Sequence, residues 1–397
     1  MQLLILIMSF LNSLKVKQNS VVAIIDISSA QVSGALVSIL SKPKSSQISR
    51  IIFNTRVPLA SEKDIDFDSF NFEVISAIKK VTHTLLNSGL PTPVKFVCFV
   101  GSPFLVSQTK VINYSQSDYF VFTKDILNEI VQKKIDDFRL ENNKTGKFSI
   151  IESKIMQIKL DGYELNDPLG HKIKQFSVAQ FLAGISTTQL DKIKQAIFSQ
   201  SHNNKIDFHS VAFASFSVLR DSLNQKKNFL VIDVGGELTD FFVCQDGVLV
   251  ENLSFPCGVN SILRNIASHQ KTFTSEAKSQ LDLYITGKLH KQAREVFERS
   301  LNVSRQKWTS SLIEALNLVS GGLVVPEHIV LLGDTKADQI FKNWLQSDDF
   351  KKYKLSNSPF KISYMDYSNL SDIHSRPNVA RDTCLVFESL FFDKINK

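Results

Sequence analysis

One strand–turn–strand pattern occurs twice in this chain, and the repeat limits the folds that the chain can adopt. The first copy is an apolar run at 21–25 that ends at Asp26 and continues through small residues into another apolar strand. The second copy is the run 229–232, followed by Asp233 and a turn with two glycines. Short, branched apolar runs are typical of strands that are buried on both faces. The repeat therefore predicts two similar halves, each a sheet covered by helices, with a ligand between the two turns.

The glycine turn in the second copy is the stronger candidate for binding. Gly235 and Gly236 lack a Cβ atom, so the backbone can turn sharply and an anion can approach its N–H groups closely. Two glycines are also compatible with an ordinary hairpin turn. Whether this turn binds anything depends on what the rest of the chain supplies.

Composition excludes several classes of protein. With 397 residues, 43% hydrophobic and 21% charged, the chain is expected to be globular, with two or three domains. Its 46 Lys and Arg against 39 Asp and Glu give a net charge of +7, but the basic residues are scattered in short runs, so we expect no nucleic-acid partner. The four cysteines form no CxxC pair and the histidines form no HExxH motif, which argues against a zinc site.

The N-terminal segment 1–19 contains an apolar run at 3–11 that is interrupted only by Ser9. This run is about half of the length that a helix needs to cross a bilayer. Lys15 and Lys17 follow the run instead of preceding it, which does not fit a secretory signal. Two interpretations stay open: an interfacial helix that contacts a membrane, or a tail whose translation begins at Met8.

Apolar periodicity predicts the remaining elements. A small inserted α/β subdomain is expected at 102–185, because the pattern changes there. The expected strands are 32–40, 51–57, 95–100, 149–160, 174–185, 239–243, 248–255, 327–332 and 360–364, and the expected helices are 70–86, 123–138 and 379–392, with helix, strand and helix in 186–222 and mostly helix in 256–319.

Four stretches resemble the actin-like ATPase superfamily, and within it the cell-division protein FtsA and the type IV pilus assembly protein PilM. AIIDISSAQVSGALV resembles the first phosphate hairpin, FLVIDVGGELTDFFVCQDGVLVENLSFPCGVNSILRNIA the second, and HIVLLGDTKADQIFKNWL the adenosine motif. IESKIMQIKLDGYELNDPLGHKIKQFSVAQFLAGIS is similar to the end of the subdomain that FtsA and PilM share, including its NDPLG turn. The resemblance covers about residues 20 to 392.

The resemblance implies an α/β fold: the actin-like, ribonuclease H-like, two-lobed ATPase fold with an inserted FtsA-type α/β subdomain. It implies an N-terminal tail at 1–19, a first lobe at 20–101 and 186–227, the inserted subdomain at 102–185, and a second lobe at 228–397.

In this superfamily ATP and Mg²⁺ lie between the lobes, and the resemblance assigns their site. Asp26 and Asp233 would be the catalytic carboxylates, which hold Mg²⁺ mostly through water. The residues assigned to the nucleotide are Asp26, Ser28, Ser29, Asp233, Gly235, Gly236, Thr239, Gly258 and Gly333.

Several positions depart from the family pattern. Ser28 replaces a glycine, the helix after His209 has no carboxylate before Arg220, and Asp334 replaces the second glycine of the adenosine motif. Lys278 and Leu281 stand where the family has a glutamate and a lysine. These changes surround one ligand, so the resemblance implies weak ATP binding and leaves ATPase activity open, with hydrolysis weak or absent.

The leading prediction is an FtsA-like cytoplasmic adaptor in cell division that binds ATP weakly and docks or polymerises at the inner face of the cell membrane. The alternatives are a PilM-like pilus assembly protein, which binds the cytoplasmic tail of an inner-membrane pilus protein, and a nucleotide-free pseudo-ATPase scaffold. The NDPLG turn favours FtsA, whereas the sequence after the apolar helix near 385–392, which continues into no amphipathic helix, favours PilM. The expected partners are a protein of the divisome or pilus machinery, a second copy of the chain, and the membrane surface.

Overall fold

The computed structural model is described for residues 20–42, 45–59, 66–143, 146–165, 167–201, 205–223, 227–319, 325–332, 338–353, 359–364 and 382–396. The predicted N-terminal tail therefore lies outside the described residues, as do Gly333 and Asp334 of the adenosine motif.

The first sheet is built around the first predicted hairpin. Its strand order is β3-β2-β1-β4-β9, with β1 antiparallel to β2, β2 antiparallel to β3, and β1 parallel to β4. Its strands are β1 (Val21–Ile27), β2 (Gln31–Lys42), β3 (Ser45–Pro58), β4 (Phe96–Val100) and β9 (Ile206–Ser210). Every residue of β1 is buried, which fits a strand covered on both faces.

The second sheet repeats the same order and the same strand directions. It runs β12-β11-β10-β13-β14, with the hairpin strands antiparallel and β10 parallel to β13. Its strands are β10 (Phe229–Val234), β11 (Thr239–Gln245), β12 (Val248–Phe255), β13 (His328–Leu332) and β14 (Lys361–Tyr364). The two halves that the repeated pattern predicts are thus present as two sheets of one topology.

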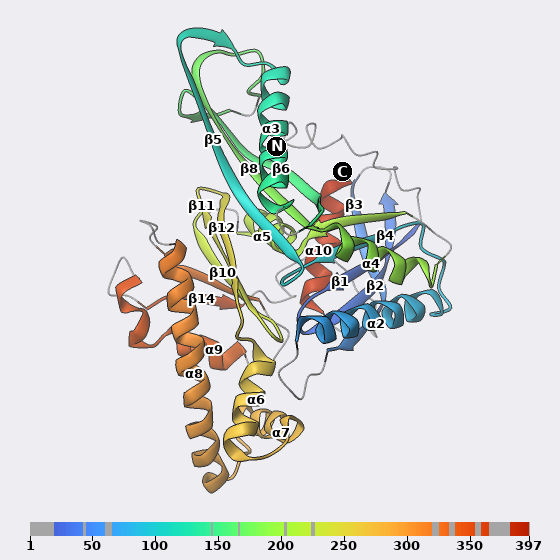
Figure 1. Ribbon diagram of the computed structural model, residues 1–397, viewed down its shortest axis with the longest axis vertical. Helices are drawn as coiled ribbons and strands as arrows, with labels where there is room; N and C mark the ends of the chain where they lie inside the picture. The colour runs from blue at the N-terminus through green and yellow to red at the C-terminus, as the bar shows by residue number, and fades with distance from the viewer. Residues whose placement is uncertain are drawn as a thin grey trace.

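Helices cover both faces of the first sheet (Figure 1). On one face α2 (Phe67–Leu86), which begins after the N-cap Asp66, packs with α4 (Thr187–Phe198). On the other face lie α5 (Val211–Ser222) and α10 (Thr383–Ile395), and the core around them also contains residues of the second sheet. The two sheets therefore share one core, with α5 and α10 between them.

The packing of α10 crosses the predicted division of the chain. This helix contacts α5, β1 and β3, although its sequence follows the second sheet. At its start, Asp382 Oδ2 accepts a hydrogen bond from the Ser33 hydroxyl of β2 at 3.1 Å and lies 3.3 Å from Arg56 of β3. The assignment of residues to two lobes stays a prediction. Helix α10, which that assignment gives to the second lobe, packs on the first sheet.

Helices on the far side of the second sheet form a separate core around Trp308. Figure 1 shows these helices toward the lower end of the molecule. These helices are α6 (Val259–Gln270), α7 (Thr274–Ile285), α8 (Lys291–Val319) and α9 (Asp338–Leu345), and the short 3-10 helix η2 (Asp348–Tyr353) lies against them. This agrees with the helical stretch expected at 256–319.

The predicted insertion forms a third sheet with one covering helix. The sheet has the order β5-β8-β6-β7, and α3 (Lys124–Asn142) packs on it. Its strands are β5 (Leu105–Val121), β6 (Phe148–Leu160), β7 (Tyr163–Glu164) and β8 (Lys172–Ser186). Figure 1 shows this unit as the upper projection of the molecule, with β5 passing close to β12 at its base.

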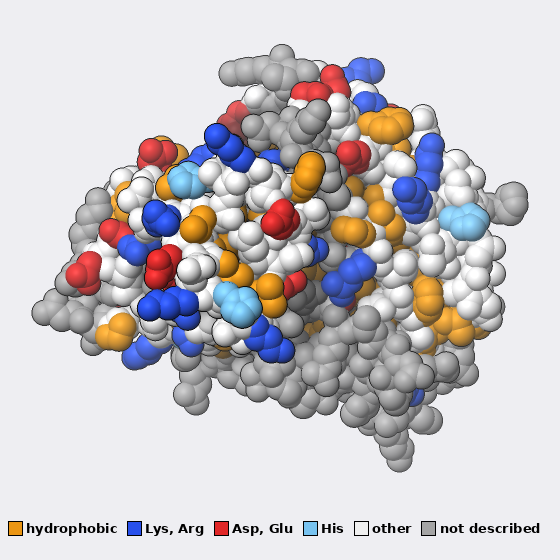
Figure 2. Space-filling model, turned by 90° about the horizontal axis from the view of Figure 1, so that it is seen from below, with side chains coloured by type: hydrophobic (Ala, Val, Ile, Leu, Met, Phe, Trp, Pro, Cys, Tyr) orange, Lys and Arg blue, Asp and Glu red, His pale blue; other side chains and the backbone are white. Residues whose placement is uncertain are grey.

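Charged side chains are mixed over the face shown in Figure 2, where Lys and Arg lie among Asp and Glu instead of forming one patch. None of the described helices is both long and apolar enough to span a membrane.

Candidate functional site

The two hairpin turns that were predicted to hold phosphate lie in direct contact. A Cβ atom at Gly236 would lie 2.6 Å from Ala30 Cα and 2.9 Å from the Ser29 carbonyl oxygen. A Cβ atom at Gly235 would lie 2.8 Å from Ser29 Oγ. Real Cβ atoms do not approach other atoms so closely. At Gly236 the obstructing atoms belong to the backbone of the facing turn, so glycine is required there, whereas at Gly235 a side chain would have to displace the Ser29 hydroxyl. Atoms of Ser29 and Ala30 therefore occupy the space next to the Cα atoms of the two glycines.

Several N–H groups of the two turns already donate to protein acceptors. The Glu237 N–H donates to Ser29 Oγ at 3.3 Å, across the two hairpins. Gly235 N–H donates to the carbonyl of Leu238 at 3.0 Å, and Ser28 N–H donates to the carbonyl of Gln31 at 3.2 Å. The Ser28 hydroxyl also donates to the Gln31 carbonyl. These donors are therefore satisfied without an anion.

The glycine turn is also held by hydrogen bonds from the start of helix α6. The N–H groups of Val259 and Asn260 donate to the carbonyls of Gly235 and Gly236 at 2.9 and 2.8 Å. Gly258, the N-cap of α6, lies so close that a Cβ atom there would be 2.3 Å from the Gly236 oxygen. The carbonyls of the turn thus satisfy orphan donors of the first helical turn, and Gly258 makes that approach possible.

An ion pair between Glu237 of the glycine turn and Arg264 of α6 holds the same turn. Arg264 Nη1 and Nη2 donate to the two carboxylate oxygens of Glu237 at 3.0 and 2.6 Å, and Asn260 Nδ2 donates to Oε1 at 3.0 Å. Both side chains of the ion pair are mostly buried. Two parallel bonds between a guanidinium and a carboxylate fix orientation as well as distance.

Thr239 is the first residue of β11 in the second sheet and is fully buried. Its hydroxyl donates to the Cys257 carbonyl at 2.7 Å and accepts from Trp308 Nε1 at 3.0 Å. The side chain that the resemblance assigns to the phosphate loop thus ties that loop to α8.

Both predicted catalytic aspartates face the core between the sheets. Asp26 lies on the same face of β1 as Val22 and Ile24, which belong to that core, and it is 1% exposed. Asp233 lies on the same face of β10 as Val231 and opposite Asp240 in the hairpin. Both aspartates therefore lie on strand faces that point toward the core between the sheets.

Two further acidic residues lie near these aspartates: Asp240, which the resemblance assigned to the support of the second hairpin, and Glu388, which sequence reasoning missed. Glu388 of α10 is fully buried, and burial together with the nearby carboxylates Asp26 and Asp382 raises the pKa of its carboxyl group well above its usual range. Burial likewise raises the pKa of Asp240 to about 6, partly offset by a hydrogen bond from Ser102. A glutamate inside the apolar run of the last helix was the one sequence signal that could have identified Glu388.

Glu152, from β6, supplies a carboxylate at the start of α5, where sequence reasoning found none. Its Oε2 accepts from Ser210 N–H at 2.9 Å and its Oε1 lies 3.0 Å from His209 Nδ1. The glutamate is 3% exposed. It therefore joins β6 of the third sheet to the end of β9 in the first sheet, and its sequence position in a strand gave no signal for this role.

The described residues do not fit a triphosphate between the turns in this arrangement. The Cβ positions of Gly235 and Gly236 are filled, and the N–H groups of Ser28, Gly235 and Glu237 already donate to protein acceptors. Phosphate would therefore require the two turns to separate. Of the two changed ribose positions, Leu281 is buried in the second core and Lys278 is exposed. Within the described ranges, no three His, Cys, Asp or Glu side chains are grouped as metal ligands.

Comparisons with known proteins match the fold and little of the sequence. No family model and no curated protein matches the chain. A solved structure described as a PilM-PilN type IV pilus biogenesis complex matches with a TM-score of 0.61 and 12% identity, over 96% of this chain and 99% of that one. A protein of actin-like ATPase fold and unknown function from Bacteroides thetaiotaomicron matches with a TM-score of 0.43 and 9% identity, over 94% of this chain and 96% of that one. The ethanolamine utilization protein EutJ from Carboxydothermus hydrogenoformans matches with a TM-score of 0.41 and 9% identity, over 86% of this chain and 83% of that one.

The duplicated sheet and the match over nearly the whole chain define the class: the chain has the actin-like ATPase fold that the sequence predicted. That fold in general binds nucleotide and Mg²⁺. The structure that supports this assignment belongs to the PilM-PilN complex, and at 12% identity it shows a common fold.

Proposed function

We propose that the chain is a PilM-like adaptor of a type IV pilus or related machine, which binds a protein partner and works with its nucleotide cleft closed. The full-length match to a structure of the PilM-PilN complex supports the kind of partner. The contact between Ser29 and the glycine turn supports the closed cleft, because it fills the space that the phosphates would need.

A closed cleft suits an adaptor because it makes one rigid body from two lobes. The shared core around α5 and α10, the contact between the turns and the Glu152 hydrogen bonds all join parts that an ATPase cycle would move. Opening would expose apolar surface and break these bonds together, at a large cost in free energy. The chain is proposed to present fixed surfaces and not to switch between nucleotide states.

Calorimetric titration of the purified chain with ATP and Mg²⁺ tests the closed cleft. We expect no binding heat at millimolar ATP, in the wild type as in the variant Asp233→Ala. Micromolar binding that disappears in Asp233→Ala would contradict the proposal, and it would support the predicted ATP site of a weakly binding ATPase.

The partner is tested with the cytoplasmic segments of inner-membrane proteins from the same genome, each made as a tagged peptide and offered to the purified chain. Binding of a pilus protein segment is the expected outcome. The cell-division role of the FtsA type, with docking or polymerisation at the membrane, stays a prediction from the NDPLG turn, and capture of a divisome segment instead would favour it. Residues 1–19 are proposed to contact the membrane only if the chain has the FtsA-type role in cell division.

A further inference from the structure

The third sheet contacts both of the other sheets. Its strand β6 lies against β9 of the first sheet, and β5 and β6 lie against β12 of the second sheet (Figure 1). Side chains of the third sheet, among them Met156 and Phe181, belong to the core that the first and second sheets share. The inserted unit therefore spans the boundary between the two halves, beside α5 and α10.

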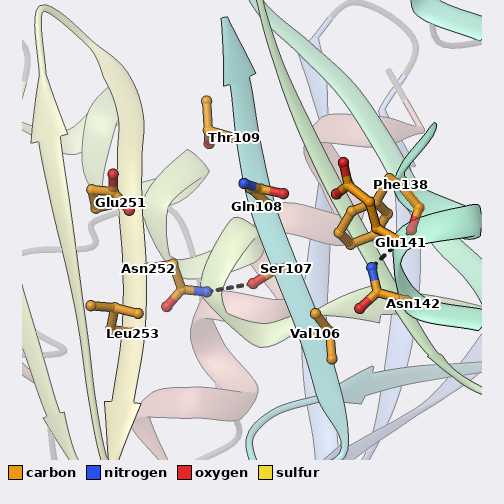
Figure 3. Close-up of a pocket in the computed structure, with 10 residues that line it drawn as sticks. All are labelled: Val106, Ser107, Gln108, Thr109, Phe138, Glu141, Asn142, Glu251, Asn252 and Leu253. Carbon is orange, nitrogen blue, oxygen red and sulfur yellow. Dashed lines mark hydrogen bonds between the residues drawn. The ribbon is translucent and has the colours of Figure 1, made fainter. Parts of the chain in front are cut away.

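Side chains hold β5 against β12 of the second sheet. Asn252 Nδ2 donates to Ser107 Oγ at 2.7 Å (Figure 3), and the Thr109 hydroxyl donates to the Leu249 carbonyl oxygen. A groove of about 300 Å³ lies beside these bonds, between β12, β5 and the end of α3, so close packing does not continue on that side. This contact can therefore break without the loss of either sheet.

The same unit is anchored to the first sheet through β6. The Glu152 carboxylate accepts from the Ser210 N–H at 2.9 Å and lies 3.0 Å from His209 Nδ1, at the end of β9. Strands β5 and β6 both pair with β8 along most of their length. The third sheet thus connects β9 to β12 as one hydrogen-bonded unit.

Strand β12 leads from this contact to the glycine turn. It ends three residues after Asn252, and Cys257 and Gly258 follow. The Cys257 carbonyl accepts from the Thr239 hydroxyl at 2.7 Å, and Gly258 is the N-cap of α6, whose first N–H groups donate to the carbonyls of the glycine turn. A displacement of β12 would pass through these contiguous contacts to the turn that faces the first hairpin.

From these observations we infer that the third sheet is a strap that holds the two halves closed, in the role that a bound nucleotide would have between them. Whatever moves the third sheet away from β12 loosens the contact between the two hairpin turns. By linkage, separation of the turns weakens the contact of β5 with β12. The inference rests on the proposed closed cleft, and it specifies what keeps that cleft closed.

The experiment measures amide hydrogen exchange by mass spectrometry in the intact chain. The strap variant combines Ser107→Ala with Thr109→Val, which removes both side-chain bonds to β12 and leaves β5 paired with β8. The Glu237 N–H, which donates to Ser29 Oγ, reports on the contact between the turns. Peptides that cover residues 233–240 and 256–263 are expected to exchange at least about threefold faster in the variant than in the wild type.

Two controls separate the strap from a general loss of stability. Ser115→Ala, at an exposed position of the same strand, should leave exchange in the turn unchanged. Peptides from α2, on the outer face of the first sheet, should exchange alike in the strap variant and the wild type. Adding Gly236→Ala to the strap variant should accelerate exchange at Glu237 little further, because the turns have already separated.

The inference is overturned if the Glu237 amide is protected in the wild type and equally protected in the strap variant, and that result would leave the proposed closed cleft intact. It is also overturned if exchange in α2 rises as much as exchange in the turn, since the variant would then be destabilised throughout. An unprotected Glu237 amide in the wild type would contradict the closed cleft itself, and the strap with it.

Discussion

Ser29 and Gly236 lie on different hairpins, 207 positions apart in the sequence, and touch so closely that a Cβ atom on the glycine would lie 2.9 Å from the serine carbonyl oxygen. Gly236→Ala is therefore expected to destabilise the chain by about 1–3 kcal/mol, because the obstructing atoms belong to the backbone and cannot turn away. Equilibrium denaturation in urea measures the change.

The control for this variant is Gly101→Ala. A Cβ atom at Gly101 would have no neighbour closer than 3.5 Å, which is ordinary van der Waals contact. Its effect on the free energy of unfolding should stay within about 0.5 kcal/mol. Equal effects of the two substitutions would show that the turns are not in contact in solution.

Thr239→Val should destabilise the chain by about 2–4 kcal/mol, because it leaves the Trp308 indole N–H and the Cys257 carbonyl buried without their partner. The neighbouring Thr309→Val is the matched control, since the buried Thr309 hydroxyl has no hydrogen-bond partner among the described residues. That control should be neutral or stabilising. Urea denaturation followed by tryptophan fluorescence compares the two, and a neutral Thr239→Val would refute the structural role.

The ion pair of Glu237 and Arg264 is expected to show a coupling free energy of about 1–2 kcal/mol in a double-mutant cycle with Glu237→Gln and Arg264→Gln. The two side chains are mostly buried and make two parallel bonds, which reduces screening by water. The exposed pair of Arg294 and Glu298 on α8 gives the comparison cycle, and its coupling should be much smaller. Similar coupling in both cycles would mean that the Glu237 pair does not hold the turn.

Glu152→Ala is expected to cost about 2–4 kcal/mol, because Ser210 N–H and His209 lose a buried acceptor. Limited proteolysis should then cleave the junction between the inserted subdomain and the first lobe faster than in the wild type. The exposed Glu129→Ala, on α3 of the same unit, serves as control and should change neither quantity. Unchanged cleavage in Glu152→Ala would argue against its role as a link.

Thiol reactivity should separate one cysteine from three. Cys98, Cys244 and Cys257 are buried, and burial raises the pKa of the Cys244 thiol to about 12 and that of Cys98 further. Thiolate is the reactive form, so these three should react with a disulfide reagent only after unfolding. The partly exposed Cys384 should give the single fast phase, which Cys384→Ser would remove. A second fast thiol in the folded protein would contradict the packing described.

Local patterns predicted the elements well, because burial on both faces leaves a clear sign in a short strand. The runs before Asp26 and Asp233 became central strands of two sheets with one topology. The last helix was expected to begin at residue 379, and the structure describes it from Thr383, after the N-cap Asp382. Residues 379–381 lie outside the described ranges.

The candidate site could be predicted as a place but not as a set of contacts. The repeat located the two turns and the two aspartates, and the resemblance located Thr239 and Gly258. Neither the repeat nor the resemblance could show that the Ser29 hydroxyl accepts a hydrogen bond from the Glu237 N–H, or that Glu388 lies near Asp26. Each pair joins segments more than 200 residues apart. The packing of the two sheets against each other decides which residues meet at such a distance in the sequence.

The sequence by itself thus determined two repeated hairpins and an inserted α/β unit, since periodicity and turn chemistry act over a few residues. Its resemblance to a known superfamily implied the actin-like fold. Only the tertiary structure decided that Gly235, Gly236 and Gly258 make room for other parts of the chain. A glycine permits close approach whatever comes near, and the facing atoms of Ser29, Ala30 and α6 occupy that space here.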